Sequence, residues 1–119
     1  MNGNKFNYVA DGAIPPFRIV KFGAGDDHRA LAGLADVAAG VTLDVGCSQA
    51  GDRIDVQEDG EARLQVGGTV AAGDWLKSDA FGRGIVTTEG AVAVQAKEAG
   101  TLDAIIRVNI TRFTKQAEA

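Results

Sequence analysis

The clearest strand in this sequence reads Asp103-Ala104-Ile105-Ile106-Arg107-Val108-Asn109-Ile110-Thr111. From Ile106 to Ile110 every second side chain is apolar and those between are polar, which predicts one buried and one solvated face. The same alternation occurs in Arg53–Gln57 and in Ala62–Val66. Because the short loop between these two runs contains Asp59-Gly60, they are predicted to form a β-hairpin.

Shorter apolar runs separated by glycine-rich turns predict further strands. These runs are Arg18–Phe22, Arg29–Ala35, Trp75–Lys77, Gly84–Thr87 and Val92–Ala96. Helix is expected at most as one turn around Asp36–Ala39, because Gly33 interrupts the alanine-rich stretch that precedes it. Many short strands joined by glycine-rich turns are typical of a small all-β barrel or sandwich with little helix.

The composition bounds the function as well as the fold. The 119 residues suffice for one hydrophobic core, and 12 Lys+Arg against 16 Asp+Glu give a net charge of -4, which disfavours nucleic acid as a partner. Cys47 and His28 are the only residues of their kinds, which excludes an internal disulfide, a cysteine-based zinc site and a histidine pair. The polar N-terminus and the short apolar runs predict neither a signal peptide nor a membrane-spanning segment, so no membrane partner is expected.

No catalytic constellation emerges from the reactive side chains. His28 lies in an acidic turn, and Cys47 is most simply a small buried residue or a loop thiol. The acidic residues of Asp52–Glu61 do not follow a calcium-loop pattern. Asp79–Gly84 does not match a phosphate-binding glycine loop and is predicted to be a hairpin turn. We therefore expect a protein that is not an enzyme and that uses no metal or cofactor. An enzyme would need an unseen site around His28 or the Asp52–Glu61 hairpin.

The N-terminal segment differs from the rest of the chain. Pro15 and Pro16 lack backbone donors and require an extended path, so this stretch is not expected inside a sheet. Its large apolar side chains are costly to leave in water and must pack either on their own domain or on a partner. They are Phe6, Tyr8, Ile14 and Phe17. The sequence thus predicts an extended arm over residues 1–17, a single β domain over 18–111 and a flexible tail over 112–119.

Four blocks of the sequence resemble the capsid decoration (cement) proteins of tailed bacteriophages. Gly12–Ala24 is similar to that family's opening pattern GAI-x-x-x-R-x-V-K-x-G, and the resemblance continues through Ala50–Val56. Gly67–Arg83 is similar to the pattern GG-x-V-x-x-GD-x-L-x-SDA-x-G-R/K, and Ala99–Val108 to the closing AGD-x-I-x-V-x-V. Trp75 stands where the family usually has proline or a small apolar residue.

The resemblance implies a β-tulip-like domain on the outer surface of a mature phage head, made in the bacterial cytoplasm. The implied partners are the major capsid protein and further copies of this chain as a homotrimer, with a dimer or a monomer left open. By bridging capsid subunits, such a domain stabilises the shell against the pressure of its packaged genome. Predicted contact residues are Phe6, Tyr8, Ile14, Pro15, Phe17 and Trp75. Deletion of residues 1–17 is expected to abolish capsid binding and to leave a folded domain.

A second class of function remains open on the sequence alone. The alternative is a carbohydrate- or ligand-binding β module on the virion surface, used for host attachment. An exposed platform formed together by Trp75, Tyr8 and Phe81 would favour this alternative.

Overall fold

Residues 5–115 are described in the computed structural model, and they form ten strands and no helix. The strands are β1 (Lys5–Ala10), β2 (Ile19–Phe22), β3 (His28–Leu31), β4 (Gly40–Thr42), β5 (Arg53–Gln57), β6 (Gly60–Gln65), β7 (Trp75–Ser78), β8 (Gly84–Val86), β9 (Gly90–Ala96) and β10 (Ile105–Lys115). The predicted all-β fold is confirmed. Over this part of the chain, no helix is present that could cross a membrane.

The helical turn considered at Asp36–Ala39 is wrong. That stretch follows a tight turn in which the Asp36 carboxylate accepts the N–H of Gly33 at 2.8 Å. Aspartate is well suited to such a turn because its short side chain reaches nearby backbone donors. The chain then runs in irregular conformation to β4.

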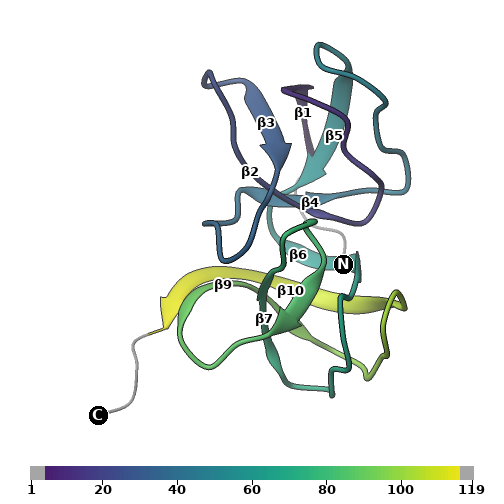
Figure 1. The fold of residues 1–119 in the computed structure, drawn as a ribbon, viewed down its shortest axis with the longest axis vertical. Helices are drawn as coiled ribbons and strands as arrows, with labels where there is room; N and C mark the ends of the chain where they lie inside the picture. The colour runs from purple at the N-terminus through teal and green to yellow at the C-terminus, as the bar shows by residue number, and fades with distance from the viewer. Residues whose placement is uncertain (1–4, 116–119) are drawn as a thin grey trace.

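The first five strands and the last five strands build two separate layers (Figure 1). Strands β1–β5 close into a barrel with the order β1-β3-β2-β4-β5, in the upper half of the view. Strands β6–β10 form a sheet with the order β6-β10-β9-β7-β8 below it. The chain therefore passes from barrel to sheet in the short link between β5 and β6.

The link between β5 and β6 overturns the predicted hairpin. Within the described residues, β5 pairs with β1 and β4, whereas β6 pairs with β10. Gly60 has a φ of 77°, and the buried Gln57 amide donates to the carbonyls of Asp59 and Glu61. These contacts turn the chain out of the barrel. Alternation along a strand indicates which face is buried, but it does not identify the partner strand.

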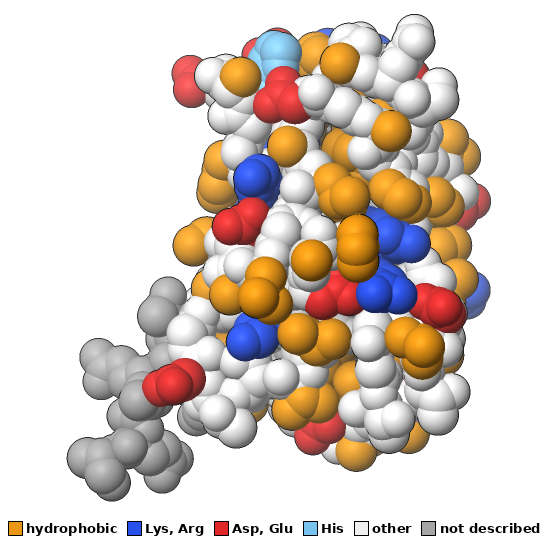
Figure 2. Space-filling model, viewed as in Figure 1, with side chains coloured by type: hydrophobic (Ala, Val, Ile, Leu, Met, Phe, Trp, Pro, Cys, Tyr) orange, Lys and Arg blue, Asp and Glu red, His pale blue; other side chains and the backbone are white. Residues whose placement is uncertain are grey.

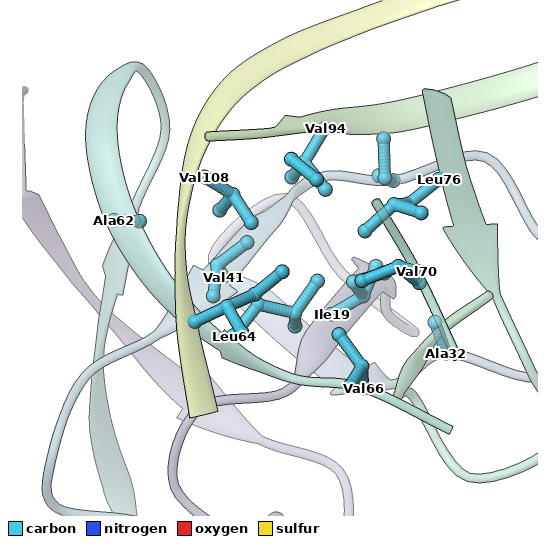
Figure 3. Close-up of a cluster of buried hydrophobic side chains, with 14 residues drawn as sticks. Ile19, Ala32, Val41, Ala62, Leu64, Val66, Val70, Leu76, Val94 and Val108 are labelled. Atoms are coloured by element: carbon cyan, nitrogen blue, oxygen red, sulfur yellow. The ribbon is translucent and has the colours of Figure 1, made fainter. Parts of the chain in front are cut away.

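Two hydrophobic clusters hold the fold together. The barrel cluster contains Ala10, Ile14, Val20, Ala39, Ile54 and Val56. The interlayer cluster joins Ile19 and Val41 of the barrel to sheet residues that include Leu64, Leu76, Val94 and Val108 (Figure 3). Successive side chains of a strand point to opposite faces, so Val20 enters the barrel cluster and Ile19 the interlayer cluster. Strand β2 thus contributes to both cores and couples the two layers.

Polar contacts reinforce the join between the layers. The Arg18 guanidinium donates to the side-chain oxygen of Gln65 at 2.8 and 3.1 Å and to the carbonyl of Phe81 at 2.9 Å. The amide of Ile19 donates to the carbonyl of Gly82 at 2.7 Å. Gly82 has a φ of 76°, and a Cβ there would lie 2.9 Å from the Ile19 carbonyl oxygen. Glycine is therefore required where the β7–β8 turn touches the barrel.

The segment predicted as an N-terminal arm is part of the barrel from Lys5 onward. Strand β1 pairs antiparallel with β5, from Lys5 opposite Gln57 to Val9 opposite Arg53, and parallel with β3. Ile14 is fully buried, and its N–H and C=O bond to the backbone of Cys47 at 3.1 and 2.8 Å. Burial of Ala10 and Ile14, together with the pairing of β1, holds this segment on its own domain, so residues 5–17 do not form a separate arm.

The segment predicted as a C-terminal tail begins inside a strand. Strand β10 continues to Lys115, with Phe113 opposite Val92 and Lys115 opposite Gly90. Its register shifts between Ile110 and Phe113, and Arg112 has a φ of 40°, as expected at a β-bulge. The bulge interrupts the alternation, which is why the end of the strand was not predicted. Residues 116–119 of the predicted tail, like residues 1–4 of the predicted arm, lie outside the described residues.

Candidate interaction surface

A line of aromatic side chains runs from the barrel to the sheet. The rings of Phe6 and Tyr8 lie 6.4 Å apart between centroids. The guanidinium carbon of Arg29 lies 3.8 Å from the centre of the Tyr8 ring and 4.8 Å from that of the Phe22 ring. In the sheet, the rings of Trp75 and Phe113 meet edge-on with centroids 5.1 Å apart. We call these residues the aromatic belt: Phe6, Tyr8, Phe22, Arg29, Trp75 and Phe113.

Strand register explains why the barrel half of the belt forms. Ala10 of β1 and Phe22 of β2 are both Cα partners of Arg29 in β3. Directly paired residues place their side chains on the same face of a sheet, and Tyr8 shares that face because it lies two residues before Ala10. Arg29 is consequently held between the rings of Tyr8 and Phe22, whose negative faces stabilise its charge.

The charge of the buried Arg29 is also balanced by polar groups. One terminal nitrogen donates to the carbonyls of Asp26 and His28 at 3.1 and 2.7 Å, and the other lies 3.8 Å from the Glu58 carboxylate. The Tyr8 hydroxyl donates to the same carboxylate. Burial, and then this hydrogen bond, raises the pKa of Tyr8, so the phenol stays protonated and continues to donate. These contacts of Arg29 and Tyr8 therefore hold the barrel half of the belt in place.

Phe22 of the barrel and Phe113 of the sheet line one apolar groove. The groove has a volume of about 210 Å³ and is lined by Phe22, Val37, Ala38, Ala91, Val92, Arg112 and Phe113. Phe22 is 58% exposed, Val37 63% and Phe113 39%. We call it the junction groove. It joins the two halves of the belt into one surface, and aromatic residues and arginine are the types enriched in protein–protein interfaces.

Exposed apolar side chains also occur away from the belt. Figure 2 shows hydrophobic side chains gathered across the middle of one face, among Lys, Arg, Asp and Glu. Phe81, in the turn between β7 and β8, is 57% exposed and lies against the Arg83 guanidinium at 5.4 Å. Single exposed apolar residues are normal on protein surfaces. The junction groove differs from them because it is concave and includes Phe113, whose ring contacts that of Trp75.

Three of the six predicted contact residues lie in the belt. They are Phe6, Tyr8 and Trp75. Ile14 does not: its exposed fraction is 0% and its side chain fills the barrel cluster, so its prediction as a contact residue is corrected. From the sequence, Ile14 was expected to pack either on its own domain or on a partner. In the structure it packs in the barrel cluster of its own domain.

The other two predicted contact residues lie elsewhere. Pro15 lines a shallow hollow together with Cys47. Phe17 has a φ of 59° and lines a second groove between the layers, with Leu43 and Arg63. The six predicted residues therefore do not form one site.

Sequence reasoning missed three members of the belt, namely Phe22, Arg29 and Phe113. Phe22 and Arg29 fell inside predicted strands with no sign of which face they share. Phe113 is the one aromatic residue of the segment predicted as a tail, and an isolated aromatic residue there was the available signal. Their proximity depends on pairings between strands far apart in the sequence.

The platform that would have favoured carbohydrate binding is not formed. Tyr8 has one face against Arg29, and Trp75 packs against Phe113. Phe81 lies instead against Arg83. In the described part of the chain, no two of the three rings Tyr8, Trp75 and Phe81 contact each other.

His28 lies beside acidic residues at the start of β3. Its Nδ1 is 2.6 Å from the Asp11 carboxylate, and its Nε2 is 3.8 Å from that of Asp27. The second oxygen of Asp11 accepts the N–H of Ala24 at 2.7 Å. Asp11 thus binds Ala24 and His28, which lie on the two sides of the turn between β2 and β3. Across residues 5–115, no three His, Cys, Asp or Glu side chains gather as a metal site would require.

Acid is expected to loosen the turn between β2 and β3. The hydrogen bond to His28, and then that from Ala24, holds the pKa of Asp11 below its usual value of 3.8. A lowered pKa stabilises the fold while the carboxylate is charged, so this contribution is complete above pH ~4 and is lost as pH falls through the folded-state pKa. The amide shift of Ala24, followed by NMR from pH 6 to 2, measures the effect. In Asp11→Asn the titration should disappear; its persistence would assign it to another group.

Comparisons with known proteins bear on the fold. No protein-family model matches the sequence, and no curated protein matches it. Among solved structures, the chain is similar to the N base of head fiber gp8.5 of bacteriophage phi29, with a TM-score of 0.77 and 18% sequence identity. The match covers 97% of this chain and 98% of that one. At this identity the likeness establishes a shared fold across nearly the whole of both chains.

Proposed function

We propose that this protein is a structural component of a tailed-phage head, a decoration protein on the outer capsid surface with the major capsid protein as its partner. The observation that carries the proposal is the fold shared with a phage head fiber base across 97% of the chain. The sequence blocks that resemble capsid decoration proteins support it independently. No catalytic step is part of the proposal.

The aromatic belt is the proposed contact surface. Burial of apolar surface stabilises a contact by ~25 cal/mol per Å², and a few aromatic and arginine residues usually dominate. The exposed rings of Phe6, Phe22 and Phe113 are of this kind. Because Arg29 and Tyr8 hold the barrel half of the belt in place, little ordering is needed on binding.

Bridging is the proposed mechanical role. The two layers of the domain share one hydrophobic core, so the domain resists deformation. Two capsid subunits that both bind it can separate only if one of their interfaces with this protein also breaks. Further copies of the chain, arranged as a homotrimer, would multiply such contacts. Trp75, at the sheet end of the belt, is the residue that we assign to a protomer contact.

Replacement of Phe22 by alanine tests the proposed contact surface. Binding of Phe22→Ala to heads that lack the protein should weaken by roughly thirtyfold, since an aromatic hot spot contributes ~2 kcal/mol. Phe81→Ala is the matched control because Phe22 is 58% exposed and Phe81 57%, and Phe81 lies outside the belt. Co-sedimentation with heads of the phage that carries the gene measures both. Equal binding by the two variants would contradict the belt, and no binding by the unaltered chain would contradict the function.

A further inference from the structure

The last residues of β10 form an open sheet edge. Pairing of β10 with β6 ends where Ile110 lies opposite Gly60, whereas pairing with β9 continues to Lys115 opposite Gly90. Among the described residues, no strand therefore pairs with residues 111–115 on the side opposite β9. Figure 1 shows this end of β10 beside β9 at the left of the view, below the chain that links β3 to β4. An edge of this kind is a template for a further strand.

The hydrogen-bonding pattern indicates which backbone groups face the open edge. The amide of Lys97 donates to the carbonyl of Arg107, so the odd-numbered residues of β9 turn their backbone groups toward β10. Ala91 is one of these, and it lies opposite Thr114. The backbone groups of Thr114 therefore face β9. Those of Phe113 and Lys115 point the other way, toward the open edge.

The junction groove lies next to this edge, over the end of the β9–β10 pair. Ala91 and Val92 of β9, with Arg112 and Phe113 of β10, form one side of it, and Phe22, Val37 and Ala38 form the other. Alternate side chains of a strand added beside β10 would lie on the same face of the sheet as this apolar space.

Arg112 adds a charge to the groove. The β-bulge directs its side chain across the join, where the guanidinium donates to the Ala39 carbonyl at 3.2 Å. Within the described residues no carboxylate forms an ion pair with it. A cation at the rim of an apolar groove favours a ligand that carries a carboxylate.

We propose that an extended segment of the capsid partner adds as a strand beside residues 111–115 of β10. Its apolar side chains enter the junction groove and an acidic side chain meets Arg112. The inference rests on the proposed function and specifies how the partner binds. A second copy of this chain that pairs through the same edge is a poorer occupant, because its residues 111–115 read Thr-Arg-Phe-Thr-Lys and carry two cations and no carboxylate that could meet Arg112.

Amide hydrogen exchange of the full chain on heads tests strand addition directly. The amides of Phe113 and Lys115 should slow by about tenfold or more on binding, because they gain partners, and the amide of Thr114 should change little. Exchange is compared for the chain bound to heads that lack it and for the free chain over a range of concentrations. Unchanged exchange in protein that has bound heads overturns the inference and leaves the proposed function standing. Slowing with concentration alone overturns it in favour of a second copy.

A pair of surface variants tests the groove itself. Val37→Asp places a carboxylate beside Arg112 and should reduce binding to heads at least about tenfold, as loss of an interface anchor does. Val45→Asp is the matched control, since Val45 is 72% exposed against 63% for Val37 and lies outside the groove. Equal binding by the two variants overturns the groove as the site. If the unaltered chain does not bind heads, the proposed function fails and the inference fails with it.

Discussion

Removal of residues 1–17 is expected to unfold the barrel instead of leaving a folded domain. The deletion removes β1, which closes the barrel between β5 and β3, and it removes Ala10 and Ile14 from the barrel cluster. Loss of a buried isoleucine side chain alone typically costs ~2–5 kcal/mol, and a domain is stable by only ~5–15 kcal/mol in total. The deletion is therefore expected to lower the free energy of unfolding by an amount comparable to the total stability of the domain.

Urea unfolding followed by tryptophan fluorescence measures this effect, because Trp75 lies in the sheet and reports whether that layer survives. A chain that begins at Lys5 is the matched control, since it keeps all of β1. We expect a cooperative transition for the control and none for the deletion of residues 1–17. A cooperative transition in the longer deletion, with retained head binding, would show that the segment is an arm after all.

Ile19→Ala is expected to destabilise both layers together by ~2–5 kcal/mol, the range for a fully buried isoleucine. Ile19 is a barrel residue, yet its side chain packs among Leu64 and Leu76 of the sheet (Figure 3). Its loss leaves a cavity between the layers that neither can close alone. The free energy of unfolding should fall without separation of the transition into two steps.

Val45→Ala is the control for this substitution. Val45 is 72% exposed, and changes at such surface positions usually stay within ~0.5 kcal/mol. Urea midpoints of Ile19→Ala and Val45→Ala give the comparison. A loss below ~1 kcal/mol for Ile19→Ala would show that the interlayer cluster repacks and is not the main coupling between barrel and sheet.

Strands with regular alternation were predictable from their own residues. Strand β10 was expected from the alternation around Val108, and Ile106 and Val108 are buried as that pattern requires. The β7–β8 hairpin was expected from the turn Asp79–Gly84, where the Asp79 carboxylate accepts the N–H of Phe81 and of Arg83 at 2.8 and 2.9 Å. Both features depend on groups close together in the sequence, so local chemistry specifies them.

Strands without a local pattern were missed. Strand β4 has three residues, Gly40-Val41-Thr42, which is too short for alternation to be recognised. Strand β1 is mostly polar or exposed up to Asn7, and only its pairing with β5 makes it a strand. Phe22 and Phe113 of the belt were missed for the same reason, because they come together only when the barrel and the sheet pack against each other.

Neighbouring residues in the sequence thus sufficed to predict the all-β character of the chain, its glycine turns and the buried face of each regular strand. The partners of those strands could not. A two-residue period states which side of a strand avoids water, and many pairings satisfy it equally well. The pairing that forms is the one that buries the most apolar surface when the barrel and the sheet pack together. In this protein β5 therefore belongs to the barrel and β6 to the sheet, and the junction groove lies where the two layers meet.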